Sequence, residues 1–153
     1  MKLILPLVLL LSLFTKAQNN YPQDYFNSPL DIPLILSGTF AELRSNHFHS
    51  GLDIKTQQRT GLKVKASADG FVSRIKVSHY GYGKALYITH PNGYTTVYAH
   101  LLKFAPEIEA YVKKHQYEKE NYEIELFPKA GDLKVLKESI VAFSGNTGGS
   151  GGP

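Results

Sequence analysis

The sequence predicts an all-β fold with an antiparallel β-sheet core and one helical insertion. Apolar and polar residues alternate in several short segments, as they do in strands that are buried on one face. Turn-forming residues separate some of these segments, and apolar residues recur at helical spacing in a single place after Pro106. The alternating segments are residues 62–68, 71–77, 85–90, 94–100 and 122–126.

Residues 1–17 have the features of a secretory signal peptide. Lys2 gives a positively charged start, an apolar run follows, and Thr15-Lys16-Ala17 offers small residues for cleavage. The run is too short for a comfortable membrane span, so we expect no membrane span after cleavage. We expect an exported protein in the periplasm, the cell envelope or the extracellular space. A retained N-terminal anchor is the alternative.

Composition excludes several classes of protein. The chain has no cysteine, so neither disulfides nor lipidation at a cleavage-site cysteine can form. Removal of residues 1–17 lowers the net charge from +4 to +2, which is too small to indicate nucleic-acid binding. Residues 18–153 are enough for one domain with a real hydrophobic core.

Residues 18–36 are expected to be an extended lead-in, because they contain three prolines, and to end in a short strand at 34–36. Residues 37–153 then form the domain. Asp69-Gly70 and Pro91-Asn92-Gly93 predict hairpin turns between successive strands. In the strand over 71–77, strict alternation places one set of side chains on a common face: Phe71, Ser73, Ile75 and Val77.

The helical insertion spans about residues 104–128. Pro106 suits the first turn of a helix, and Ile108, Tyr111 and Val112 lie at helical spacing. Because the insertion interrupts a continuous order of hairpins, we expect deletion of Glu107 to Tyr122 to leave the β core intact.

His49 and Asp53 form the candidate metal site. A neutral imidazole and a carboxylate are both good zinc ligands. On a straight strand residues four apart lie about 13 Å apart, so a bend is needed, and Gly51 can supply one. On spacing alone, an ordinary surface loop remains an alternative.

His100 ends the strand over 94–100 beside a series of tyrosines, where packing is the simpler interpretation on position alone. The glycine-rich stretch from Ser144 is not a phosphate-binding loop, because no Gly-Lys-Ser/Thr follows it.

Taken in order, these pieces resemble the lysostaphin-type zinc endopeptidases of bacterial cell walls, also called the glycyl-glycine endopeptidase family. The resemblance covers Leu36 to Pro153. Each matching segment is weak alone, but the ordered set is specific. The segments are His49-Ser-Gly-Leu-Asp53, Ala68-Asp-Gly70, Tyr82-Gly83, His90-Pro-Asn-Gly93, Tyr98-Ala-His-Leu101 and Ser144-Gly-Asn-Thr-Gly148.

The resemblance implies an antiparallel core that contains a duplicated hybrid motif, one zinc ion and a peptidoglycan peptide as substrate. His49 and Asp53 would bind the zinc. His100 would act as general base or steady the developing oxyanion. Which peptide bond is cut does not follow from the sequence.

The sequence departs from the family at several positions. The third zinc ligand of the family lies in a His-x-His motif just after the glycine loop, where this sequence reaches Pro153. We therefore expect a fragment of a longer enzyme, inactive in this form. In addition, Glu138 stands where a turn glycine is common, and Phe40, Glu42 and Arg44 replace an upstream tyrosine.

A protein of a different class is the alternative. A catalytically degenerate envelope module could bind peptidoglycan or activate a partner hydrolase. The joint presence of His49, Asp53 and His100 favours the enzyme, because a degenerate module has no need for all three.

Overall fold

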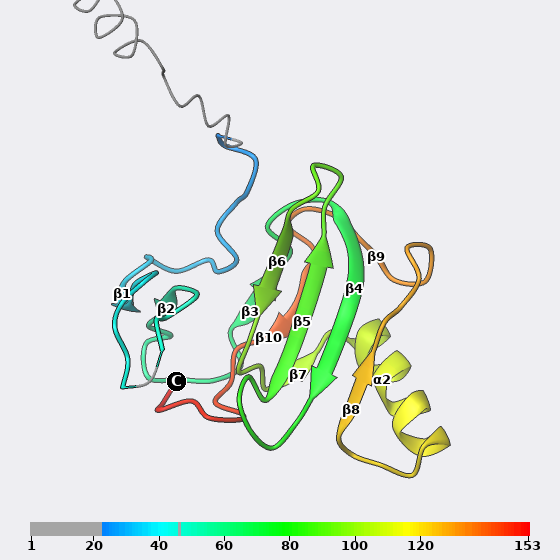
Figure 1. Ribbon diagram of the computed structural model, residues 1–153. Coiled ribbons are helices and arrows are strands. Elements are labelled where there is room, and N and C mark those ends of the chain that lie inside the picture. The colour runs from blue at the N-terminus through cyan, green and yellow to red at the C-terminus, as the bar shows by residue number, and fades with distance from the viewer. Residues whose placement is uncertain (1–22, 46) are drawn as a thin grey trace, which may run out of the picture.

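A computed structural model describes residues 23–45 and 47–153 (Figure 1). The expected signal peptide, 1–17, and the first part of the lead-in lie outside the described residues. The described part confirms the antiparallel β architecture with a single helix, α2 (Pro106–Glu118). The strands are β1 (Leu36–Gly38), β2 (Asp53–Ile54), β3 (Lys63–Lys65), β4 (Gly70–Val77), β5 (Lys84–Thr89), β6 (Thr95–Tyr98), β7 (Lys103–Phe104), β8 (Ile124–Leu126), β9 (Lys134–Val135) and β10 (Ile140–Phe143).

The strands form three antiparallel sheets. β1 and β2 make a small ribbon, β3, β10 and β7 make a second sheet, and the largest has the order β6-β5-β4-β8 with β9 also paired to β4. Within 23–45 and 47–153 no helix is both long and apolar enough to cross a membrane.

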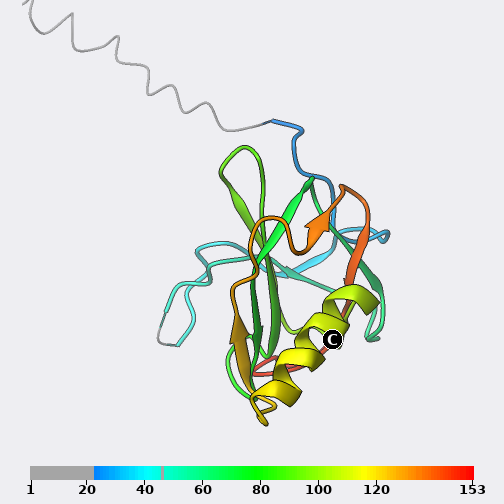
Figure 2. The ribbon, with the colours of Figure 1, turned by 90° about the vertical axis from the view of Figure 1, so that its right-hand side faces the viewer.

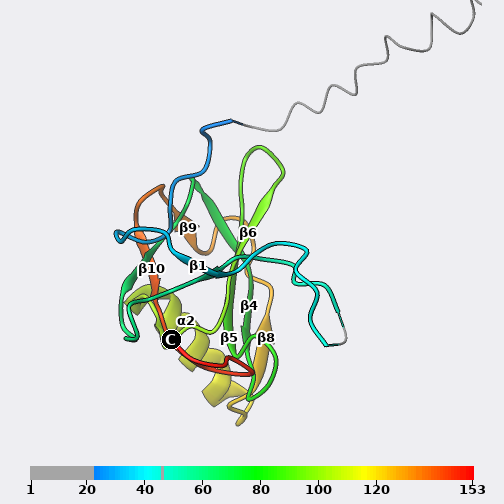
Figure 3. The same ribbon diagram turned by 90° about the vertical axis from the view of Figure 1, so that its left-hand side faces the viewer.

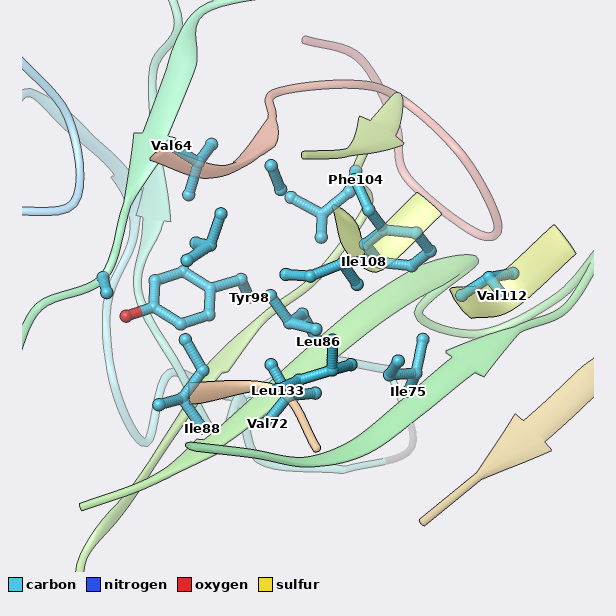
Figure 4. Packing of buried hydrophobic residues seen from close by; sticks show 14 of the residues in the cluster. Val64, Val72, Ile75, Leu86, Ile88, Tyr98, Phe104, Ile108, Val112 and Leu133 are labelled. Carbon is cyan, nitrogen blue, oxygen red and sulfur yellow. The ribbon is translucent and has the colours of Figure 1, made fainter. Parts of the chain in front are cut away.

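The hydrophobic core lies between the two larger sheets and is closed by α2. Figure 4 shows side chains from both sheets and from the helix converging on one interior. The three-stranded sheet contributes Val64 and Phe104, and the largest sheet contributes Val72, Ile75, Leu86 and Ile88. Burial of such side chains is the main favourable term in folding.

Asp69-Gly70 was expected to be a hairpin turn, and this prediction is wrong. β3 and β4 belong to different sheets, because β3 pairs with β10 whereas β4 pairs with β5. The chain crosses between the sheets at Ala66 to Asp69, and Ala66 exchanges backbone hydrogen bonds of 2.9 Å with Glu138 and Ser139. Small buried residues suit this crossing, and local turn chemistry gave no sign of it.

The prediction that Phe71, Ser73, Ile75 and Val77 share one face is correct only for the second half of the strand. Val72, Ile75 and Val77 are buried, whereas Phe71 is only partly buried. The pairing of β4 with β5 shifts between Val72 and Arg74. A bulge at this point reverses the alternation, which a strict period of two cannot anticipate.

The turn at Pro91-Asn92-Gly93 is confirmed, with His90 N–H donating to the Tyr94 carbonyl at 2.9 Å. The strand that follows ends at Tyr98, earlier than expected. Thr96 and Tyr98 share a face as predicted, because the Thr96 hydroxyl donates to Tyr98 Oη at 3.1 Å. His100 lies beyond the strand.

The helix is part of the core. Figure 2 shows α2 lying along one side of the sheets, next to β8. Ile108 and Val112 are buried in the common core with Phe104. The expectation that the β core folds without the insertion does not fit this packing, because its removal would expose the apolar surface beneath it.

We predict that Ile108→Ala destabilises the fold by about 2–4 kcal/mol, because it leaves a cavity in the core. Tyr117→Ala on the same helix is the control, since Tyr117 is 81 % exposed, and it should change stability by less than about 0.5 kcal/mol. Urea unfolding measures both. Equal, small effects would show that the helix is a removable lid.

The lead-in is fastened to the body by charged groups around Lys65. Its ammonium donates to Asp31 at 2.5 Å and to Glu138 at 2.8 Å, and the Asn27 amide donates to Glu138 at 2.6 Å. The Lys65 hydrogen bond, followed by that of Asn27, lowers the pKa of Glu138 below its ordinary value of 4.5. Glu138 has a φ of 68°, in the left-handed region that favours glycine.

A carboxylate with a lowered pKa contributes stability above its ordinary pKa, and this contribution is lost as the pH falls through the lowered value. We therefore predict that the backbone N–H groups of Asn27 and Lys65 become less protected from hydrogen exchange as the pH falls below 4.5. Glu138→Gln should lower that protection already at neutral pH. Glu107→Gln, on the exposed start of α2, is the control. If Glu138→Gln leaves the hydrogen-exchange protection of these N–H groups unchanged at neutral pH, the prediction is wrong.

Candidate metal centre

His49 and Asp53 are brought together by the segment between β1 and β2, which projects from the two larger sheets (Figure 3). Asp53 begins β2 and pairs with Gly38 of β1. His49 lies on the returning arm of the loop, where its N–H donates to the Glu42 carbonyl at 2.8 Å and its carbonyl accepts from Ala41 N–H at 2.7 Å. The backbone thus holds both candidate ligands.

The two side chains meet at their polar ends. His49 Nε2 lies 3.2 Å from Asp53 Oδ1, and His49 Nδ1 lies 3.0 Å from the Thr39 carbonyl oxygen. A carbonyl only accepts hydrogen bonds, so Nδ1 carries a proton. Nε2 of this tautomer then faces the carboxylate with a lone pair, and it is the atom through which the ring would bind a metal ion.

The pair fits one edge of a zinc site. Two ligands of a tetrahedral zinc ion, each about 2.0–2.2 Å from it, lie roughly 3.4 Å apart. The hydrogen bond from His49 to a backbone carbonyl is also the usual second contact of a metal-binding histidine, because it fixes the ring and its tautomer. The expected bend is present at Gly51, but Gly51 has no left-handed φ, and a Cβ there would meet only His49 Nε2 at 3.8 Å. The bend therefore does not depend on glycine.

A complete metal site is not formed by the part of the chain that the structure describes. Across residues 23–45 and 47–153, no group of three His, Cys, Asp or Glu side chains is arranged to hold a metal ion. The described residues thus supply two candidate ligands, and the role of each stays a prediction.

His100 is held in an unusual conformation at the turn after β6. Its φ is 56°, in the left-handed region, and its N–H donates to the Tyr82 carbonyl at 2.9 Å. Its Nδ1 donates to the Thr147 carbonyl at 2.8 Å. The remaining nitrogen of the neutral ring, Nε2, is therefore able to accept a proton.

The glycine loop expected from the sequence is what fixes His100. Figure 1 shows this C-terminal segment, in red, running beside the loop between β4 and β5. A Cβ added to Gly145 would lie 2.2 Å from Leu102 N and 2.7 Å from the His100 carbonyl oxygen. The Thr147 hydroxyl donates to the Leu101 carbonyl and accepts from Lys84 N–H, both at 2.9 Å. Backbone therefore packs directly on backbone at this point.

Tyr82 connects the two halves of the candidate site. Its hydroxyl lies 3.3 Å from Ser50 Oγ, beside His49, and its ring meets the His100 ring edge-on at 6.1 Å between centroids. Through these contacts the loop that carries Tyr82 lines the candidate site. The contacts also place His100 near the loop that carries His49.

Sequence reasoning missed the groups that support the candidate residues. The Thr39 and Thr147 carbonyls orient the two histidines, and backbone acceptors leave no trace in a sequence. Arg44, noted only as a departure from the family, donates to Asp53 Oδ2 at 2.7 Å. The only sign of this contact in the sequence was that Arg44 precedes Asp53 by nine residues.

The fold and site together describe a β domain that carries a histidine–carboxylate pair of metal-ligand character beside a separately positioned histidine. Residues 47–117 match the model of peptidase family M23, and the chain belongs to this family. The match includes His49, Asp53 and His100, as well as most of α2.

Similar curated proteins agree with this assignment. The chain is 32% identical over 111 residues to the DD-carboxypeptidase/endopeptidase Mpg of Neisseria meningitidis serogroup B, covering 72% of this chain and 20% of the relative. It is 43% identical over 63 residues to Mpg of Neisseria gonorrhoeae, covering 41% and 14%. An uncharacterized metalloprotease of Haemophilus influenzae is 33% identical over 105 residues, covering 69% and 17%. The chain thus spans a fifth or less of the length of these relatives.

We predict that Gly145→Ala displaces the His100 turn, because its Cβ would collide with rigid backbone, and that it costs about 1–3 kcal/mol. Gly151→Ala is the matched control, since a Cβ there meets nothing within 4 Å. Unfolding curves and the NMR signals of the His100 ring measure the two effects. If Gly145→Ala leaves both unchanged, the loop does not position His100.

Proposed function

We propose that this chain belongs to the catalytic domain of a zinc metalloendopeptidase that cleaves peptide cross-links of bacterial peptidoglycan. The principal support is the approach of His49 Nε2 to Asp53 Oδ1 at 3.2 Å, with Nδ1 bonded to a backbone carbonyl. Membership of a peptidase family supports hydrolysis of a peptide bond. The resemblance to cell-wall endopeptidases supports peptidoglycan as the substrate.

The residues would divide the chemistry between them. His49 and Asp53 would hold zinc, which when bound polarises a scissile carbonyl and lowers the pKa of water. His100, with Nδ1 tied to Thr147, would accept a proton from the attacking water at Nε2. The same nitrogen would then donate that proton to the departing amine, as a general acid–base does.

The proposed place of action is outside the cytoplasm: in the periplasm, in the cell envelope or in the extracellular medium. The supporting observation is the charged, apolar and small-residue sequence of 1–17. Peptidoglycan, the proposed substrate, would be reached there.

A second function is favoured by the incomplete ligand set. The described residues hold no group of three metal-ligating side chains. A domain limited to two ligands could bind peptidoglycan or activate a partner hydrolase without cleaving it. By the same argument, we propose that the 153-residue chain is inactive by itself.

We predict weak zinc binding by the 153-residue chain and tight binding after addition of a His-x-His segment beyond Pro153, because a tetrahedral site needs further ligands. In the extended chain, His49→Ala and Asp53→Ala should abolish both zinc binding and the clearing of purified cell walls. His100→Ala should retain the zinc and lose cleavage by roughly 10²–10⁴-fold. Zinc content and the turbidity of the wall suspension measure these effects.

Other results would assign the roles differently. Loss of zinc in His100→Ala with retention in His49→Ala would contradict the roles proposed here. Loss of zinc in His47→Ala, with none in His49→Ala, would identify the neighbouring histidine as the ligand. Binding to walls without clearing, even with zinc bound, would favour the non-catalytic module.

A further inference from the structure

The candidate ligands belong to a closed ring of polar contacts within residues 39–53. Thr39 N–H donates to Glu42 Oε2 at 3.0 Å, and Glu42 Oε1 lies 3.6 Å from Arg44 Nε. Arg44 Nη2 donates to Asp53 Oδ2 at 2.7 Å, and Asp53 Oδ1 faces His49 Nε2. His49 Nδ1 closes the ring on the Thr39 carbonyl. Each ligand is therefore fixed from two sides.

Arg44 and His49 both contact Asp53, yet they use different oxygens of its carboxylate. The Arg44 contact consumes Oδ2, which leaves Oδ1 facing the imidazole. Arg44 Nη2 also lies 3.4 Å from His49 Nδ1, which is a longer contact than the 3.0 Å between Nδ1 and the Thr39 carbonyl oxygen. The guanidinium acts on the pair through Asp53.

The backbone has room for this ion pair only because residue 38 is a glycine. A Cβ on Gly38 would lie 2.3 Å from Asp53 Oδ2 and 2.4 Å from Arg44 Nη2. Because Gly38 pairs directly with Asp53 in the β1–β2 ribbon, the ribbon itself makes the space that the guanidinium and the carboxylate fill.

We propose that Arg44 is a positioning residue for the metal site, which holds Oδ2 of Asp53 so that the carboxylate offers only Oδ1 to the ion. This inference rests on the proposed zinc site of His49 and Asp53. Contacts of this kind behind a metal ligand typically change metal affinity by about 10–100-fold. A guanidinium suits the task, because it stays charged and its planar donors match a carboxylate.

The charge of Arg44 opposes a divalent cation nearby, and Glu42 offsets that opposition. Glu42 Oε1 lies on the Nε side of the guanidinium, away from the Nη2 that contacts Asp53. The Glu42–Arg44 pair is therefore close to neutral as seen from Asp53. Orientation of the carboxylate, and not attraction by Arg44, is what the pair contributes.

The test is a zinc titration of the 153-residue chain at fixed pH, followed by the imidazole NMR signals of His49, which report weak binding at this site alone. Arg44→Met should weaken zinc binding at least about 10-fold, and Arg44→Lys should recover part of the loss. Glu42→Gln should also weaken binding, because it leaves the Arg44 charge uncompensated. Arg59→Met is the control, since the Arg59 guanidinium bonds Gln57 at 2.8 Å, and it should change nothing.

A second measurement, urea unfolding, separates positioning from a general structural role. Arg44→Met should leave the urea midpoint of unfolding unchanged while it weakens zinc binding, because an ion pair this exposed adds little to stability. Unchanged or tighter zinc binding in Arg44→Met, or a loss that Arg44→Lys does not partly recover, would overturn the proposal. If Arg44→Met disorders the loop, Glu42→Gln becomes the deciding variant. Unchanged zinc binding in Glu42→Gln then overturns the proposal.

The same titration distinguishes failure of the zinc site from failure of this inference. If chelatable zinc binds equally well to His49→Ala, measured by equilibrium dialysis, the proposed metal site itself is wrong. If His49→Ala removes the binding while Arg44→Met does not weaken it, the site stands and only the positioning role fails.

Discussion

The direct packing of the glycine loop against two other backbone segments is the constraint on which the candidate site depends. Gly145 lies against the His100–Leu102 backbone, and a Cβ on Gly148 would lie 2.4 Å from Gly83 N. No side chain separates these segments, so the end of β10, the β4–β5 loop and the turn after β6 form one unit. A left-handed φ at a histidine is costly, and it persists here because the surroundings determine it from several sides.

The two halves of the site are stabilised in different ways. His100 is held against the body of the domain by the glycine loop. His49 and Asp53 instead lie in a projecting segment and are held by contacts among the residues of that segment. Ion pairs that are this exposed add little to folding stability, so the contacts around Asp53 matter for orientation more than for the free energy of unfolding. The Tyr82–Ser50 contact at 3.3 Å joins the halves.

The sequence predicted what is local and missed what depends on distant segments. Alternation gave the strands and helical spacing gave α2, because each pattern belongs to one element. The meeting of His49 with Asp53 was predictable for the same reason, since both lie in one short loop. The switch of sheets after Ala66 and the bulge between Val72 and Arg74 depend on which strands become neighbours. The carbonyl that holds His100 belongs to a residue far along the chain, and only the resemblance to a family connected the two.

The contacts around Asp53 also explain how the candidate ligand pair is held in shape. Arg44 fixes one carboxylate oxygen, and the Thr39 carbonyl fixes the ring. The position between Nε2 and Oδ1 then suits a small cation such as a metal ion. Two ligands hold such an ion weakly, because most of its coordination is still open. The segment is thus organised in advance for a metal, while tight binding depends on ligands that it does not itself supply.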